Sequence, residues 1–256
     1  MGAPSAEERV AMDKLRDQLK DILATISDDY FKSDSFFIRF LRARENNVDA
    51  AEKMIRATLT WRRENGIDTL ASEPISPFCD ANFPVSIEGR DRVGRPLVTV
   101  PMGRWDLKQA NTDDERAVEF RRYNIQVCER IMAEIRRADV EQTGHVPITQ
   151  YTVIYDWEGF SCRPMLSISL DKRMVQITTL VESNYPETLA NCIYINCSSF
   201  ISTVLSIIKP AMSSRTFGRI RHFGVDRAIW VPVVLELVDP TQLTPQFDWI
   251  FDLNLN

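Results

Sequence analysis

The chain has 256 residues, of which 44% are hydrophobic and 26% are charged, and its formal net charge is −5. This length allows a substantial buried core, and the composition is that of a folded globular protein rather than a disordered one. The acidic balance argues against a nucleic-acid partner, because a surface that binds nucleic acid is expected to be basic.

Several other classes of protein are disfavoured by what the sequence lacks. Its first residues have no apolar signal-peptide core, so secretion is not expected. The five cysteines show no CxxC spacing and are expected to be reduced and mostly buried, as in a cytoplasmic protein. With only two histidines, no metal site is predicted. No Walker phosphate loop, nucleophile elbow or HExxH motif occurs, and no enzyme activity is predicted.

The first 70 residues are predicted to form a helical N-terminal lobe. Apolar residues recur at helical spacing over residues 6–26. A short helix is expected to follow, with Asp34 as its N-cap, and a longer one is expected between Asn47 and Gly66. We therefore divide the chain into a lobe at residues 1–70 and a second domain at 71–256.

The pattern changes to a period of two from about residue 82. The segments 83–89 and 96–102 flank a turn at Gly94, which predicts a β-hairpin. The following elements are expected to be a long helix at 114–138, a buried strand within 148–159, a helix ending near 184, a strand at 192–196, a helix from Ser199, a strand at 222–225 and a helix at 227–238. Strands that alternate with helices predict an α/β fold with a mainly parallel sheet.

Residues 188–208 contain no charged side chain, yet their hydroxyl and amide groups are too many for a membrane span. The expected helix places apolar residues on one face: Phe200, Ile201, Val204, Leu205 and Ile208. Its other face carries uncharged hydroxyl groups: Ser199, Ser202, Thr203 and Ser206. From this pattern alone, a helix packed on both sides inside the domain and a lid at the surface are equally good interpretations.

Five segments together resemble one known family. They are FFIRFLRARENNVDAAEKMIRATLTWRRENG, GRPLVTV, YDWEGF, NYPETLANCIYINCSSFISTVLSIIKPAM and LTPQFD, which fall between residues 30 and 248. They are similar to the CRAL-TRIO lipid-transfer family, and most to its phosphatidylinositol transfer proteins. The resemblance implies a helical lobe beside a sheet that floors a hydrophobic pocket, closed by a mobile gate helix whose apolar face is the one named above.

The resemblance also implies a ligand and a location. The ligand would be one bound phospholipid, with no cofactor, and the protein would exchange phosphatidylinositol between membranes. We expect a cytoplasmic monomer that contacts membranes peripherally and can present its lipid to a lipid kinase.

The family's headgroup site falls on Arg44, Glu187, Thr216 and Arg219. Cationic and hydroxyl donors suit a phosphodiester, and a carboxylate accepts hydrogen bonds from inositol hydroxyls. Two simpler interpretations compete. Arg44 can be a cation that stabilises a helix C-terminus, and Pro186–Glu187 can be the start of a helix.

The positions that match the family's phosphatidylcholine site are Ile87, Val98, Tyr151 and Val153. Choline is usually held by aromatic faces, and three of these side chains are aliphatic. Phosphatidylcholine exchange is therefore expected to be weak.

Other functions remain open from the sequence. The same fold could carry a sterol, a tocopherol or a retinoid. Asp156 and Glu158 follow a strand, where catalytic groups of an α/β hydrolase or phosphatase often lie, although Asp156 also suits a turn closed by Gly159. A protein-interaction scaffold is a further alternative.

Overall fold

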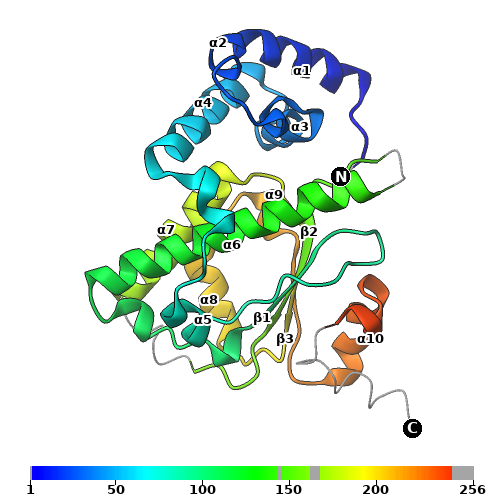
Figure 1. Cartoon of the computed structure of the whole chain (residues 1–256). Helices are drawn as coiled ribbons and strands as arrows, with labels where there is room; N and C mark the ends of the chain where they lie inside the picture. Colours follow the sequence, from blue (N-terminus) through cyan, green and yellow to red (C-terminus); the bar gives the residue numbers. More distant parts are fainter. Residues whose placement is uncertain (1, 143–145, 162–167, 244–256) are drawn as a thin grey trace.

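The computed structural model describes residues 2–142, 146–161 and 168–243 (Figure 1). The N-terminal helices are α1 (Ala6–Gln18), α2 (Lys20–Leu23), α3 (Asp34–Ala43) and α4 (Val48–Asn65). They pack around a core of their own, which includes Leu15, Leu19, Phe37, Phe40 and Ile55. In Figure 1 these helices lie at the top, above the long helix α6 (Asp114–Glu141).

Both ends of α4 agree with the expectation from the sequence, whereas the N-cap of α3 differs from it by one residue. The side chain of Asn47 accepts a hydrogen bond from the backbone of Ala50, and Gly66 ends α4 with a φ of 60°. The N-cap of α3 is Ser33 rather than Asp34, because the Ser33 hydroxyl accepts from the amide of Phe36. Asp34 is instead the first helical residue, where a carboxylate is favoured by the helix dipole.

The sheet has four parallel strands in the order β1-β2-β3-β4, which confirms the α/β prediction. The strands are β1 (Leu97–Pro101), β2 (Tyr151–Asp156), β3 (Leu189–Ile195) and β4 (Ile220–His222). The strand expected at 222–225 begins two residues earlier, because its register is set by pairing with β3, where Cys192 lies opposite Ile220.

The expected hairpin before β1 is reduced to isolated contacts. The turn is present, since the amide of Gly94 donates to the carbonyl of Asp91. Only single antiparallel bridges join Ser86 to Thr99 and Arg90 to Pro96. A continuous first strand does not form among the described residues 83–90, because Gly89 has a φ of 81° that turns the backbone out of the extended conformation.

Helices cover both faces of the sheet (Figure 1). Helices α6, α7 (Ile168–Asn184) and α8 (Ile201–Ile208) lie over one face, and α10 (Arg227–Leu237) lies over the other. Two short helices, α5 (Pro77–Asn82) and α9 (Ser214–Phe217), complete this part. Alternate strand residues therefore serve different cores: Val153 packs toward α6 and α7, whereas Ile154 and Ile193 pack against Trp230 of α10.

A buried ion pair joins the N-terminal helices to the rest of the chain. Arg62 on α4 donates two hydrogen bonds, of 2.7 and 3.0 Å, to the carboxylate of Glu129 on α6. The hydroxyl of Tyr185 donates to the same carboxylate at 2.6 Å. The side chains of Arg62 and Glu129 are 8% and 6% exposed, and Arg62 also pairs with the exposed carboxylate of Asp68 at 2.7 Å.

Substituting alanine for Glu129 is expected to lower the free energy of unfolding by about 3 kcal/mol. Arg62 would remain buried with only the exposed Asp68 as its partner, and the buried Tyr185 hydroxyl would lose its acceptor. Urea denaturation followed by circular dichroism measures this change. The matched control is Glu134→Ala on the same helix, whose partners Arg137 and Arg90 are 59% and 23% exposed. Together these surface pairs are expected to contribute about 1 kcal/mol or less. Equal losses in the two variants would show that the buried pair is not a specific link.

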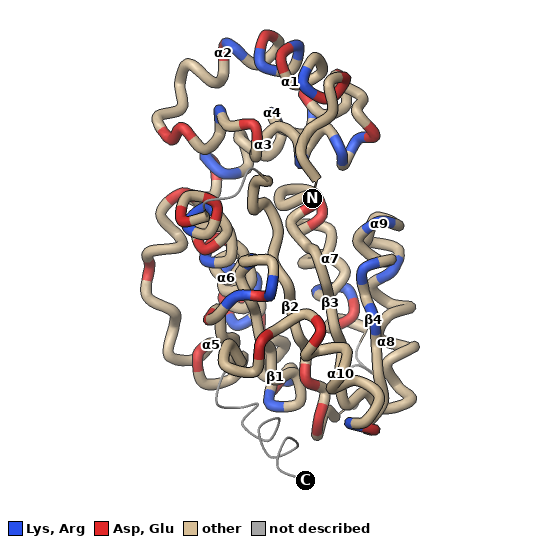
Figure 2. Tube along the Cα trace, turned by 90° about the vertical axis from the view of Figure 1, so that its right-hand side faces the viewer, with Lys and Arg blue, Asp and Glu red and all other residues tan. Residues whose placement is uncertain are grey.

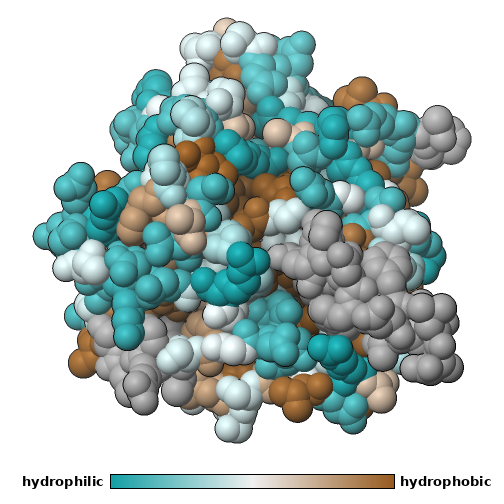
Figure 3. All heavy atoms as spheres, turned by 60° about the horizontal axis from the view of Figure 1, so that its bottom comes forward, coloured by the Kyte–Doolittle hydropathy of each residue, from teal (hydrophilic) through white to brown (hydrophobic). Residues whose placement is uncertain are grey.

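No helix among the described residues is long and apolar enough to cross a membrane. On the face shown in Figure 3, hydrophilic residues dominate the surface, and hydrophobic residues lie in recesses and small spots between them.

Candidate functional site

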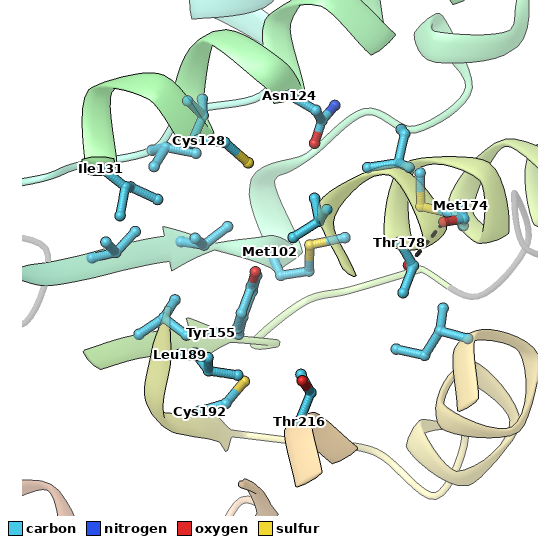
Figure 4. A pocket seen from close by; sticks show the side chains of 18 of the residues that line it. Met102, Asn124, Cys128, Ile131, Tyr155, Met174, Thr178, Leu189, Cys192 and Thr216 are labelled. Carbon is cyan, nitrogen blue, oxygen red and sulfur yellow. Dashed lines mark hydrogen bonds between the residues drawn. The ribbon is translucent and has the colours of Figure 1, made fainter. Parts of the chain in front are cut away.

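A large cavity lies between the sheet and helices α6, α7 and α8 (Figure 4). It encloses about 1520 Å³, including the part that opens to solvent. Most of its wall is aliphatic or aromatic, and includes Val98, Val100, Met102, Trp105, Leu107, Val127, Ile131, Val153, Trp157, Phe160, Met174, Ile177 and Val181.

The strands form the floor of this cavity because side chains of every second residue point to it. Val98, Val153 and Cys192 are opposite one another on three neighbouring strands, and all three line the cavity. Tyr151 and Tyr155 of β2 lie on the same face of the sheet as Val153 and also line it. The floor therefore combines aliphatic residues with phenol rings.

Helix α8 is amphipathic in the way that its sequence predicts. Ile201, Val204 and Leu205 are buried, Phe200 and Ile208 are half-buried, and Val204 and Ile208 line the cavity. The hydroxyl-bearing residues of the other face are all exposed, namely Ser199, Ser202, Thr203 and Ser206. The interpretation of a helix packed on both sides is therefore wrong, and α8 forms one outer wall of the cavity. Its mobility as a gate stays a prediction.

Charged and hydroxyl groups gather at one edge of the cavity. Glu187 and Thr216 both line it. The carboxylate of Glu187 accepts from Arg215 and from Arg219, each at 3.2 Å, and its side chain is 7% exposed. Figure 2 shows the Lys and Arg residues that gather on α9 and the segment leading into β4. Three of the four predicted headgroup residues, Glu187, Thr216 and Arg219, therefore lie in one region.

The local backbone explains how Glu187 reaches this region. Helix α7 ends at Asn184, and Pro186 and Glu187 form a turn that leads into β3. Glu187 has a φ of 59°, a left-handed conformation that only a minority of non-glycine residues adopt. The interpretation of Pro186–Glu187 as the start of a helix is therefore wrong.

Arg219 is a partly desolvated cation. Burial lowers its pKa below the ordinary value, and the negative charge of Glu187 offsets part of this effect. Its side chain also donates to the carbonyl of Leu189. Arg215, Arg219 and Glu187 together carry one net positive charge, which can balance a single anionic group placed beside them.

The fourth predicted residue, Arg44, lies elsewhere in this structure. It is the C-cap of α3, is exposed, and donates to the carbonyl of the adjacent Ala43. It is not among the described residues that line the cavity. The simpler interpretation, a cation at a helix C-terminus, agrees with this position. A role of Arg44 in headgroup binding stays a prediction.

Arg215 was missed by the sequence analysis. Its guanidinium donates to Glu187 and, at 3.0 Å, to the carbonyl of Arg42 at the end of α3. It thus joins α9, the turn before β3 and the N-terminal helices. The available signal was its position directly before Thr216 and four residues before Arg219, but such spacing carries little information without the path of the backbone.

Of the four residues predicted for a second ligand, three are among the described residues that line the cavity and one is not. Val98, Tyr151 and Val153 line the cavity. Ile87 is half-buried against the core, and its neighbour Val85 lines the cavity instead.

Asp156, the last residue of β2, has a structural role. Asp156 accepts hydrogen bonds from the amide of Glu158 and from the side chain of Asn196, at 3.0 and 2.8 Å. Gly159 follows with a φ of 76°. These contacts identify Asp156 as the turn residue that the sequence also favoured. Within the described part of the chain, no group of three or more His, Cys, Asp or Glu residues could hold a metal ion.

Comparison with known proteins finds relatives that are similar to this chain in sequence. "Phosphatidylinositol/phosphatidylcholine transfer protein SFH9" of Arabidopsis thaliana is 28% identical over 250 residues, which cover 94% of this chain and 41% of that protein. "Protein real-time" of Aedes aegypti is 26% identical over 215 residues, which cover 82% of this chain and 32% of that protein. The chain therefore spans less than half the length of either relative.

A solved structure and two sequence profiles complete the comparison. The crystal structure of Sfh5 superposes with a TM-score of 0.64 at 16% identity, over 80% of this chain and 69% of that chain, and so shares the fold. The profile of the CRAL/TRIO domain matches residues 80–247, and that of the CRAL/TRIO N-terminal domain matches residues 11–57. The chain therefore belongs to the CRAL/TRIO family of lipid-binding proteins.

Proposed function

We propose that this chain is a non-enzymatic carrier that extracts phosphatidylinositol from a membrane and exchanges it between membranes. The observation that carries the proposal is the edge of the large apolar cavity, where Glu187 lies between Arg215 and Arg219 and next to Thr216. Such a cavity suits a lipid, and such an edge suits an anionic headgroup with many hydroxyl groups.

The energetics of the acyl chains explain why a cavity is needed. Each CH₂ group of a lipid chain left in water costs about 0.8 kcal/mol, so two chains amount to on the order of 20 kcal/mol. A phospholipid therefore cannot leave its membrane through water. The apolar walls given by the sheet and by α6, α7 and α8 replace the bilayer interior during transfer.

The headgroup chemistry matches the charged edge. A phosphodiester carries one negative charge, which the guanidinium groups of Arg215 and Arg219 can neutralise through charge-assisted hydrogen bonds. Inositol hydroxyls are donors, and the carboxylate of Glu187 is an acceptor for them. The names of two Arabidopsis thaliana relatives, SFH9 and SFH7, include phosphatidylinositol/phosphatidylcholine transfer, at 28% and 27% identity.

We further propose that α8 is the gate. Its outer face is hydroxylated and uncharged, so little charge must be desolvated when it enters a membrane interface. Lys209 is exposed directly after this helix and can meet anionic headgroups. Such a gate suits a protein that contacts membranes peripherally. We place that protein in the cytoplasm, where it can present the exchanged lipid to a lipid kinase.

Phosphatidylinositol is expected to be transferred at least about ten times faster than phosphatidylcholine, a difference of about 1.4 kcal/mol. Val98 and Val153 offer choline no aromatic face in the cavity floor, although Tyr151 lies nearby. Transfer of fluorescent or radiolabelled lipids between donor and acceptor vesicles measures both rates. Equal rates would contradict the expected selectivity.

Native mass spectrometry of the protein purified from cells tests the alternative ligands. The mass of phosphatidylinositol supports the proposal, whereas the mass of a sterol, a tocopherol or a retinoid would replace it with a carrier of an apolar ligand. Recovery of no lipid would favour a protein-interaction scaffold.

A further inference from the structure

Two tyrosines that line the cavity differ from the other tyrosines of the chain in the hydrogen bonding of their hydroxyls. The sequence has six tyrosines. The hydroxyl of Tyr185 donates to Glu129, that of Tyr123 donates to the carbonyl of Phe83, and that of Tyr30 accepts from Arg39. The hydroxyl of Tyr194 interacts with the thiol of Cys192. Tyr151 and Tyr155 remain, and among the described residues neither hydroxyl has a hydrogen-bond partner.

These two residues occupy the cavity floor behind the charged edge. Both belong to β2, and Tyr151 lies opposite Leu189, two residues beyond Glu187. Cys128 and Cys192 line the same cavity, and Cys192 lies opposite Val153, which stands between the two tyrosines along β2. Figure 4 shows Tyr155 extending from the sheet into the space that Cys128 on α6 and Thr178 on α7 also border.

The chemistry of the two phenols selects a neutral acceptor. Burial is the largest cause that raises the pKa of Tyr151 and of Tyr155, so both stay protonated at neutral pH and can donate a hydrogen bond. Their neighbours in the floor, Val98 and Val153, carry no charge that could balance an anion, and the carboxylate of Glu182, which also lines the cavity, would repel one. An ionised phosphate is instead favoured at the arginines of the edge.

A ligand that fills the cavity displaces water from these hydroxyls. A purely hydrocarbon ligand would leave both donors buried without an acceptor, which is unfavourable. A diacyl glycerolipid has two ester carbonyl groups between its headgroup and its chains, and each is a neutral acceptor. Tyr151 lies next to the charged edge, opposite Leu189, and Tyr155 lies four residues further along β2, so the two donors follow the edge as the ester groups of a lipid follow its headgroup.

We infer that Tyr151 and Tyr155 form a second binding subsite that donates hydrogen bonds to the ester carbonyls of a diacyl glycerolipid. The subsite selects ester-linked over ether-linked lipids. It rests on the proposed function to the extent that the cavity holds a glycerophospholipid, but it is independent of which headgroup that lipid carries.

In the test, the full chain is incubated with vesicles that contain four lipids. Vesicles contain equal amounts of diacyl and dialkyl phosphatidylinositol and of diacyl and dialkyl phosphatidylcholine, with matched chain lengths. Native mass spectrometry then gives the fraction of protein that carries each lipid. The wild type is expected to favour diacyl over dialkyl forms by about tenfold, or about 1.4 kcal/mol. Tyr151→Phe and Tyr155→Phe each remove one hydroxyl but keep the ring, and the double variant is expected to lose this preference.

Tyr30→Phe is the matched control, because it removes a tyrosine hydroxyl that lies outside the cavity, in the N-terminal helices. It is expected to keep the wild-type preference. Equal occupancy by ester and ether lipids in the wild type would overturn the inference, and so would a double variant with an unchanged preference. A linkage preference without a headgroup preference would support this subsite and contradict the proposed phosphatidylinositol selectivity. Binding of none of the four lipids would contradict both.

Discussion

Substituting lysine for Glu187 is expected to abolish phosphatidylinositol transfer. The variant removes the acceptor of two arginines and places a third cation beside them. Each lost hydrogen bond to a charged group corresponds to about 1.5–3 kcal/mol, or roughly a tenfold to hundredfold loss of affinity. Lipid transfer between vesicles measures the effect. Some loss of stability is also expected, because the Glu187 side chain is 7% exposed and the added charge would be partly buried.

Two further variants separate the binding effect from the stability effect. Glu187→Gln keeps the shape and one acceptor oxygen, and should retain the fold with a smaller loss of transfer. Glu236→Lys makes the same charge reversal on the exposed side of α10, across the sheet from the cavity, and should transfer normally. Normal transfer by both Glu187→Lys and Arg44→Ala would show that the headgroup assignment is wrong.

Two variants, Arg44→Ala and Arg215→Ala, test which arginine binds the phosphate. Arg44 is the residue expected from the sequence, and Arg215 is the one that lies beside Glu187 in the structure. If Arg215 binds the phosphate, its loss should slow transfer more than the loss of Arg44, whose side chain meets only the carbonyl of Ala43. A larger effect of Arg44→Ala, at unchanged stability, would show that Arg44 moves to the headgroup when lipid binds.

Substituting aspartate for Ile208 is expected to slow lipid transfer by about a hundredfold or more. Ile208 lines the cavity from the last turn of α8 and is half-buried. A carboxylate there would face the acyl chains and would have to be desolvated at each opening, at a cost of several kcal/mol. Ile201→Asp is a less informative change, because Ile201 is 7% exposed and a buried charge would unfold the domain as well as block transfer.

Ile229→Asp is the matched control for this change. Ile229 is 61% exposed on α10, so the same substitution leaves the carboxylate in water and away from the cavity. Hydrogen exchange provides an independent measurement. Residues 200–212 are expected to exchange faster on liposomes than in solution if α8 opens at the membrane. Unchanged protection of this segment on membranes, together with normal transfer by Ile208→Asp, would make α8 a fixed wall.

The sequence by itself determined those features that depend on near neighbours in the chain. The side chain of Asn47 and the left-handed backbone of Gly66 bound α4 through groups within one helical turn. The two faces of α8 follow from the order of its apolar and hydroxyl residues, which the helix period converts into an inner and an outer surface. The alternation of strands with helices along the chain similarly predicted a mainly parallel sheet.

Only the tertiary structure decided which distant groups meet. Whether Pro186–Glu187 starts a helix or a turn depends on how β3 enters the sheet, and the start of β4 depends on pairing with β3. Arg215 meets both Glu187 and the carbonyl of Arg42 near the end of α3, an arrangement that no local spacing encodes. The free hydroxyls of Tyr151 and Tyr155 became visible for the same reason: a hydrogen-bond partner, or its absence among the described residues, is a property of three-dimensional surroundings.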